Sequence, residues 1–317
     1  TISDSYSLSD VRSTGSYIGG FIGAGDSSNI GTSVSNSWAL GDVKGFMRAG
    51  GFIGTNSGVS ISYSHAHGNV QSDEQTGGFV GNNISTSGTL SWSYATGEVK
   101  SNASVRTGGF VGLSEKGITD SYATGNVYGG NTTGGFSGQG HGDTTRSFAT
   151  GNVYGADNTG GFVGAQSGAT YGNIFATGNV YGANNVGGVA GITGFANRSY
   201  STGAVFGNTN VGGFIGRATL DNLVQSYTRS KAYARTPPAY AFVANPSGTT
   251  VNWMNNYWDS EIESSDGTNL LASDAGKYES RTTTQLKSKL SPLNGFDMTN
   301  DWTMVDGLAE IPIEERE

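Results

Sequence analysis

Two short phrases alternate along most of this sequence, and each occurs nine times in an intact or degenerate form. The first is Gly-Gly-Phe followed by Ile or Val and Gly, with its third position at Phe21, Phe52, Phe79, Phe110, Phe136, Phe162, Val189, Phe214 and Phe242. The second is Ser-aromatic-Ala-Thr-Gly-Asn-Val, with its second position at Tyr6, Trp38, His65, Tyr94, Tyr122, Phe148, Phe175, Tyr200 and Tyr227. A period of 25 to 32 residues predicts one supersecondary unit stacked on copies of itself.

Both phrases have the composition of β-strands. They are short, rich in β-branched and aromatic residues, and bounded by Gly, Asn and Ser. In the copy that runs from Ser121 to Gly129 the alternation breaks at Gly125, which we interpret as a corner between two strands. The sequence therefore predicts an all-β fold, a parallel β-solenoid of about nine coils with three short strands per coil. Residues 1–250 would form this solenoid, with adjacent coils about 4.8 Å apart.

Four columns of equivalent residues indicate which side chains face inward. The nearly invariant Val column and the small Ala column are expected inside, together with the Phe of the first phrase. The residue after each Val varies between Lys, Gln, Tyr and Phe, and an unpaired Lys is not buried, so this column must face outward. Its members are Lys44, Gln71, Lys100, Tyr128, Tyr154, Tyr181 and Phe206.

Composition narrows the classes of function. Charged residues make up only 13% of the chain and the net charge is −8, which argues against a nucleic-acid partner because little basic surface could neutralise phosphates. The chain has no cysteine, so it contains neither a disulfide framework nor a zinc–thiolate site. We find no run of 18 apolar residues, and therefore expect no membrane span.

The repeated Gly-Gly-Phe-Val-Gly core resembles the GLUG repeat of large bacterial surface proteins, including filamentous-haemagglutinin-like adhesins and some immunoglobulin-A proteases. The segments Asn255–Glu261, Thr283–Lys287, Gly295–Asp297 and Asp301–Thr303 look like the tail that often closes such arrays. The resemblance implies an extracellular or cell-surface adhesin, stalk or fibre segment of a bacterium. It implies no catalytic residues for this chain, which lacks a His-Glu-x-x-His motif.

Residues 251–317 are expected to cap the last coil. The pattern Thr282-x-x-Gln285 reads as a capping box that starts a short helix through Lys289, ended by Pro292. Trp253, Trp258 and Trp302 would supply the apolar area. The N-terminal end shows no comparable segment, so one alternative function is a filament in which copies of this chain dock head to tail.

Tyr128, Tyr154, Tyr181 and Phe206 are the candidate ligand-binding residues. They would form an outward aromatic stripe over four successive coils, on which the rings of a glycan or the surface of a partner protein could stack. A host or matrix glycan or a surface protein is thus the expected partner. Two long connections, 24–36 and 82–91, are further candidates. The alternative that the rings simply pack on one another and shield the sheet stays open.

Other patterns suggest alternative functions. Asp120 and Arg146 stand at the same position of adjacent coils, with Arg198 two coils further; they suit either an ion pair or the site of a carbohydrate-active β-helix enzyme. His65 and His67 could bind a metal only with a third ligand, so we expect no metal and no cofactor. A hydroxyl ladder is compatible with ice binding or with cross-coil pairing, and comprises Thr96, Thr124, Thr150, Thr177 and Thr202. A non-catalytic adhesin or stalk remains the favoured interpretation.

Overall fold

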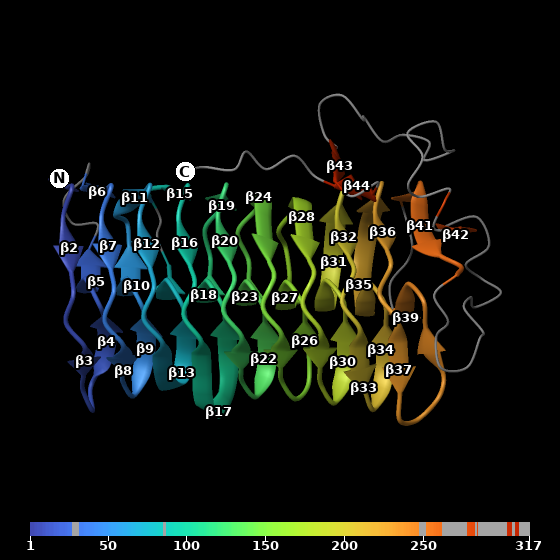
Figure 1. Ribbon diagram of the computed structural model, residues 1–317, viewed down its shortest axis with the longest axis horizontal. Coiled ribbons are helices and arrows are strands. Elements are labelled where there is room, and N and C mark those ends of the chain that lie inside the picture. The colour runs from blue at the N-terminus through green and yellow to red at the C-terminus, as the bar shows by residue number, and fades with distance from the viewer. Residues whose placement is uncertain are drawn as a thin grey trace.

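The computed structural model describes residues 1–26, 32–84, 87–246 and 252–261, with short pieces at 278–282, 284, 303–305 and 308–310. The described residues form an all-β rod, a parallel β-solenoid, which confirms the predicted fold class, with about eight turns where about nine coils were predicted (Figure 1). The helix expected between Thr282 and Lys289 lies almost entirely outside the described residues. Within the described ranges no helix has the length and apolarity to cross a bilayer.

The larger sheet has 26 strands and lies in the upper part of Figure 1. One column of strands follows each Gly-Gly-Phe phrase: β5 (Ile22–Asp26), β10 (Ile53–Ser57), β14 (Val80–Asn83), β18 (Val111–Ser114), β23 (Ser137–Gly140), β27 (Val163–Gln166), β31 (Ala190–Asn197), β35 (Ile215–Val224) and β39 (Val243–Pro246). The next column is β1 (Ile2–Ser3), β6 (Ser33–Ser35), β11 (Ser60–Ser62), β15 (Leu90–Ser91), β19 (Ile118–Thr119), β24 (Thr144–Ala149), β28 (Tyr171–Ala176) and β40 (Asn252–Met254). The Ser-aromatic phrase supplies β2 (Tyr6–Ser7), β7 (Trp38–Ala39), β12 (His65–Ala66), β16 (Tyr94–Ala95), β20 (Tyr122–Ala123), β32 (Tyr200–Ser201) and β36 (Tyr227–Thr228). This column is continued by β41 (Asn256–Asp259) and β42 (Tyr278–Arg281), which lie beyond the last copy of the phrase.

The second sheet has 16 strands and lies in the lower part of Figure 1. The strands that carry the Val column are β3 (Val11–Arg12), β8 (Val43–Lys44), β13 (Val70–Gly77), β17 (Val99–Gly108), β21 (Val127–Tyr128), β25 (Val153–Tyr154), β29 (Val180–Tyr181), β33 (Val205–Gly207) and β37 (Ala232–Ala234). Those that lead back to the Gly pair are β4 (Ser16–Gly19), β9 (Met47–Gly50), β22 (Asn131–Gly134), β26 (Thr159–Gly160), β30 (Asn184–Gly187), β34 (Thr209–Gly212) and β38 (Ala239–Tyr240). Outside both sheets, β43 (Thr303–Val305) and β44 (Leu308–Glu310) form an antiparallel pair.

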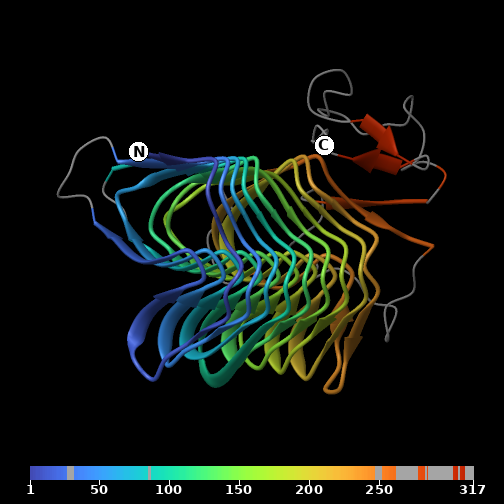
Figure 2. The ribbon, with the colours of Figure 1, turned by 60° about the vertical axis from the view of Figure 1, so that its left-hand side comes forward.

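Most coils contain four or five short strands rather than the predicted three, because the chain turns more often than Gly125 alone suggested. In the coil of Tyr122, the left-handed residue Asp120 (φ 51°) separates β19 from β20, and Gly125 separates β20 from β21. Two columns of such left-handed corners, neither made of glycine, run the length of the rod. Figure 2 shows how closely successive coils follow one another as a result.

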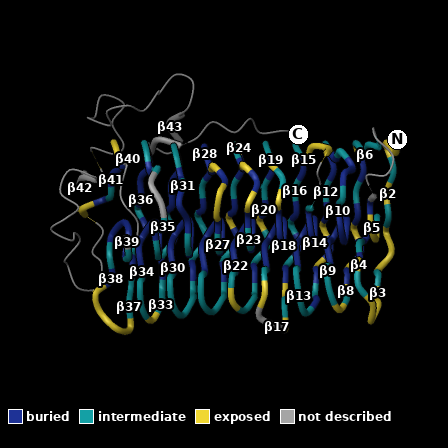
Figure 3. Tube along the Cα trace, turned by 180° about the vertical axis from the view of Figure 1, so that it is seen from behind, coloured by how far each residue is buried: buried dark blue, intermediate teal, exposed yellow. Residues whose placement is uncertain are grey.

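The inward columns are those expected from the sequence. Val43 and Val127 are 1% and 0% exposed, Ala66 and Ala123 are 0% and 1% exposed, and Phe52 is 0% exposed. Buried positions therefore recur at the same levels of every coil (Figure 3). The Phe rings stack with centroids 4.7 to 5.0 Å apart, which matches the spacing of parallel strands.

The Gly pair divides the interior into two apolar columns. A Cβ atom on Gly108, the last residue of β17, would lie 2.7 Å from the backbone nitrogen of Gly138 in β23 of the larger sheet, so no side chain fits between the two sheets here. The Phe and Ala residues belong to one cluster on one side of this constriction. The Val columns form separate clusters on the other side. We call this constriction the waist.

Serine side chains connect neighbouring coils beside the waist. The hydroxyl of Ser64 donates to the carbonyl oxygen of Ser62 and accepts the backbone N–H of Ser37 from the preceding coil. Ser93 and Ser121 repeat this arrangement in the following coils, at 3.3 Å for each inter-coil contact. Because each buried hydroxyl has both a donor and an acceptor role, the Ser of the second phrase is a structural requirement.

The waist generates a prediction about stability. Gly108→Ala should lower the free energy of unfolding by about 3 kcal/mol, since its Cβ would collide with the backbone of Gly138 and Phe136 in the opposite sheet. Gly172→Ala is the matched control, because its Cβ would meet nothing nearer than 3.8 Å. Denaturant unfolding followed by circular dichroism measures both, and equal midpoints for the two variants would contradict the account of the waist.

Candidate functional site

The predicted stripe is a straight column of stacked rings on the outer face of the smaller sheet. Tyr128, Tyr154, Tyr181 and Phe206 are half-buried, and neighbouring ring centroids lie 4.8 to 4.9 Å apart with interplanar angles of 3° to 4°. The structure adds a fifth ring, Tyr233, which stacks 4.8 Å from Phe206. The sequence pattern missed Tyr233 because its inward neighbour is Ala rather than Val.

The stacking decides how a ligand can meet the stripe. Rings at the coil spacing cover each other's faces, so a sugar ring cannot insert between them, contrary to the stacking on sugar rings that the sequence suggested. At one end of the column, Nζ of Lys100 lies 5.1 Å from the centroid of Tyr128. At the other end, Nζ of Lys231 lies 5.3 Å from the centroid of Tyr233. The rings therefore present their edges and phenol hydroxyls to the outside.

The backbone beneath the stripe is fixed by an asparagine ladder at the preceding corner. Oδ1 of Asn126 accepts the N–H of Asn152, and Oδ1 of Asn152 accepts that of Asn179, each at 2.9 Å. Within the described ranges the amide nitrogens of these three side chains make no hydrogen bond. Each coil thus offers one amide donor and one aromatic edge on the same strip of surface.

A second aromatic column runs along the outer face of the larger sheet. Its rings belong to the second phrase and stack with centroids 4.7 to 5.6 Å apart from Tyr6 to Tyr227. Trp38 through Phe175 are half-buried, whereas Tyr200 and Tyr227 are buried. The sequence carried a signal for this column, because each ring from Trp38 to Phe175 precedes an inward Ala and successive residues of a strand face opposite ways.

His65 lies inside this second column. Its ring stacks between Trp38 at 5.6 Å and Tyr94 at 4.8 Å, and His67 meets it edge-on at 4.9 Å. Burial, and then the positive charge of a protonated His67, lower the pKa of His65 to about 4. Nδ1 of His67 is 3.0 Å from the hydroxyl of Thr96. Over the described residues no cluster of three potential metal ligands occurs, and neither histidine is within such a group.

The lowered pKa of His65 predicts a pH dependence of stability. The usual pKa is 6.5, so between pH 6.5 and 4 the unfolded chain binds more protons here than the folded chain does. The free energy of unfolding is therefore highest above about pH 6.5, falls as the pH drops towards 4, and changes no further from this group below about pH 4. We expect His65→Phe to lose this contribution, since Phe148 and Phe175 occupy the same column.

Thermal unfolding midpoints across this pH range measure the effect. The difference between wild type and His65→Phe should change with pH between 6.5 and 4. His141→Asn removes a histidine elsewhere on the rod and serves as the control. Parallel curves for wild type and His65→Phe would show that the stacked imidazole titrates normally.

The residues considered for catalysis form an ion pair between coils. Nε and one terminal nitrogen of Arg146 each lie 2.7 Å from a carboxylate oxygen of Asp120. This bidentate contact raises the pKa of the Arg146 guanidinium. Arg198 instead donates from Nε to Asn173 at 2.9 Å. All four residues have positive φ, so these side chains bridge successive left-handed corners, as the ion-pair interpretation requires.

The threonine ladder faces outward beside the second aromatic column. Thr124 and Thr150 are exposed, whereas Thr96, Thr177 and Thr202 are half-buried. Each Thr follows an inward small residue, Ser201 before Thr202 and Ala before the others, so the row shares its face with the aromatic rings.

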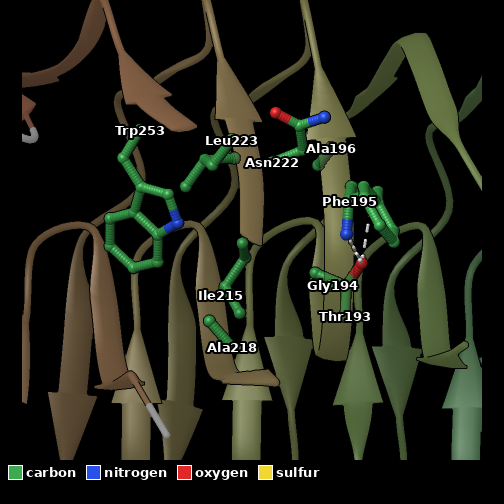
Figure 4. Close-up of a pocket in the computed structure, with 9 residues that line it drawn as sticks. All are labelled: Thr193, Gly194, Phe195, Ala196, Ile215, Ala218, Asn222, Leu223 and Trp253. Atoms are coloured by element: carbon green, nitrogen blue, oxygen red, sulfur yellow. Dashed lines mark hydrogen bonds between the residues drawn. The ribbon is translucent and has the colours of Figure 1, made fainter. Parts of the chain in front are cut away.

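The interior offers little space near the C-terminal end of the rod. A gap in the larger apolar column is lined largely by apolar side chains, among them Phe195, Ile215, Leu223 and Trp253 (Figure 4). Its free volume for a water molecule is about 0 Å³. Nearby, Tyr171 packs edge-on against Phe162, and burial raises its pKa to about 12. Ligand contacts therefore have to be sought on the outer surface.

The chain continues its parallel stacking past residue 250. Leu223 is aligned with Trp253 and Thr228 with Trp258, and an ion pair at 3.0 Å joins Arg229 to Asp259. Trp253 is 7% exposed, and Trp258 packs against the larger apolar cluster, which is consistent with two of the three tryptophans expected to cover the last coil. The third, Trp302, lies outside the described residues. Parts of the two long connections, 27–31 and 85–86, lie outside them as well.

Comparisons with known protein families, with curated proteins and with solved structures found no match to this chain.

Proposed function

We propose that this chain is a non-catalytic rod of a GLUG-like bacterial adhesin, stalk or fibre, located outside the cell. It binds a glycan or a partner protein through the aromatic stripe. The repeated phrases and the tail of the sequence support the family, and the family supports the location. The aromatic stripe supports the binding role.

The geometry of the stripe is the observation that carries this proposal. Five rings run parallel to the rod axis at one ring per coil, with an Asn side chain beside each of the first three. Aromatic edges next to hydroxyl and amide groups combine apolar area with hydrogen-bonding groups, as protein surfaces that bind partners do. A straight repeating strip suits a ligand that is extended along the rod.

The ion pair of Asp120 and Arg146 favours the absence of catalysis. Both carboxylate oxygens of Asp120 are engaged by Arg146. The side chain of Asp120 is also only 7% exposed, so a substrate could reach little of this carboxylate. The pair connects two corners of the rod, which supports a structural role.

The binding role predicts that Tyr154→Ala weakens binding to a glycan array by about tenfold, because it removes a ring that stacks on neighbours at both sides and loosens both of them. Tyr154→Phe should have a smaller effect, since it keeps the stack, as Phe206 does, and loses only the hydroxyl. The array measures each apparent affinity with circular dichroism as the check on folding.

Thr150→Ala is the control, because Thr150 is exposed in the threonine ladder beside the second aromatic column and is not part of the stripe. Binding by Tyr154→Ala that equals wild type would remove the stripe from the ligand contact. Release of reducing ends from a polysaccharide panel by the wild-type chain would contradict the non-catalytic assignment.

A further inference from the structure

The column that forms the stripe begins with charged residues. Arg12, Lys44, Gln71 and Lys100 precede Tyr128 at the same position of successive coils, and each is aligned with the next. Two residues before each of them stands an acid or its amide, namely Asp10, Asp42, Asn69 and Glu98. A hollow of about 280 Å³ lies over this part of the rod, with both columns and two buried valines in its lining.

The acidic column is largely engaged within the protein. Oδ1 of Asp10 accepts the N–H of Asp42 at 2.9 Å, and Oδ1 of Asp42 accepts that of Asn69 at 2.8 Å. These aspartates therefore continue the backbone ladder that Asn126 and Asn152 form farther along. Glu98 is longer and reaches Lys100, with Oε1 2.5 Å from Nζ.

Arg12 and Lys44 are left as adjacent cations. They are aligned on neighbouring strands, both are exposed, and within the described ranges neither has a carboxylate at ion-pair distance. Like charges directly opposite each other on paired strands destabilise the pairing. An anion that bridges the two side chains would offset this repulsion, and a carboxylate is the shape that a guanidinium binds with two hydrogen bonds.

The other wall of the hollow indicates what else the ligand carries. Asp42 has a second carboxylate oxygen beside the hollow, and Asn69 contributes an amide. Carboxylate oxygens accept hydrogen bonds from hydroxyl groups. The hollow therefore fits a ligand that bears a carboxylate for Arg12 and Lys44 and hydroxyl donors for Asp42. A uronic acid has both groups.

We propose that this hollow binds a uronic-acid unit of an acidic linear polysaccharide, with the carboxylate on Arg12 and Lys44 and sugar hydroxyls on Asp42. The volume suits a short stretch of chain, because it lies near the lower end of the range for small-molecule sites, about 300–1,000 Å³. The hollow adjoins the stripe at Lys100, but none of the stripe's rings lines it.

Isothermal titration of the whole chain with trigalacturonate at low ionic strength tests this proposal. The fully methyl-esterified trisaccharide is the matched ligand, since it keeps the sugar rings and removes the charge. We expect the acid to bind at least about tenfold more tightly than the ester, and added salt to weaken only the acid. Equal affinity for acid and ester would overturn the proposal.

The variants Arg12→Gln and Lys44→Gln place at each site the residue that the rod itself carries at Gln71. Each should weaken trigalacturonate binding about tenfold, whereas Arg235→Gln, an exposed cation outside the hollow, should leave it unchanged. Tyr154→Ala separates this site from the stripe. If it abolishes trigalacturonate binding while Arg12→Gln and Lys44→Gln do not, the sugar binds the stripe and the hollow is not the site. A sulfated oligosaccharide that binds the hollow as tightly as trigalacturonate would overturn the assignment to uronic acids.

Discussion

Direct contact between backbone atoms at the waist determines the rest of this structure. A Cβ on Gly108 of the smaller sheet would lie only 2.7 Å from the backbone nitrogen of Gly138 in the larger sheet, so the two sheets meet with no side chain between them. The Phe column and the Val column must then fill two separate spaces. Large rings such as Trp38, Tyr94 and Tyr128 accordingly lie on the outer faces of the sheets. The outer columns of aromatic and charged residues follow from the lack of room inside.

Stacking coils at this spacing also leaves backbone groups that need hydrogen-bond partners, and polar side chains supply these partners. Where the chain turns, backbone N–H groups lack a strand partner, and Ser, Asn or Asp oxygens of the neighbouring coil accept them. This use of oxygen atoms has a chemical consequence. It leaves the amide donors of Asn126 and Asn152 on the surface, and it withdraws one oxygen of Asp42 from any pairing with Lys44. The polar groups on the outer surface are thus those that remain after side-chain oxygens have accepted the backbone N–H groups at the corners.

Side-chain direction could be predicted from the sequence wherever a column was nearly uniform. The Val, Ala and Phe columns are buried, and the column of Lys44 and Tyr128 faces out, because burying Lys unpaired is costly. The number of strands could not be predicted, since left-handed corners at residues such as Asp120 and Arg146 have no side-chain signature of their own. The sequence also did not predict that the ring faces of the stripe cover one another. This covering follows from the equality of coil spacing and ring spacing, which only the parallel alignment of Tyr128 with Tyr154 establishes.

The outer column of the smaller sheet is where this fold permits chemical change. Its inward neighbours Val43 and Val127 are held between close-packed walls, yet the outward residue passes from Lys44 to Tyr128 without any shift in strand alignment. Cations reach into a hollow in the early coils, whereas rings cover the sheet in the later ones. A rod of this kind can acquire a new ligand by substitution in one column, because the hydrogen bonds and apolar contacts that hold the coils together lie elsewhere.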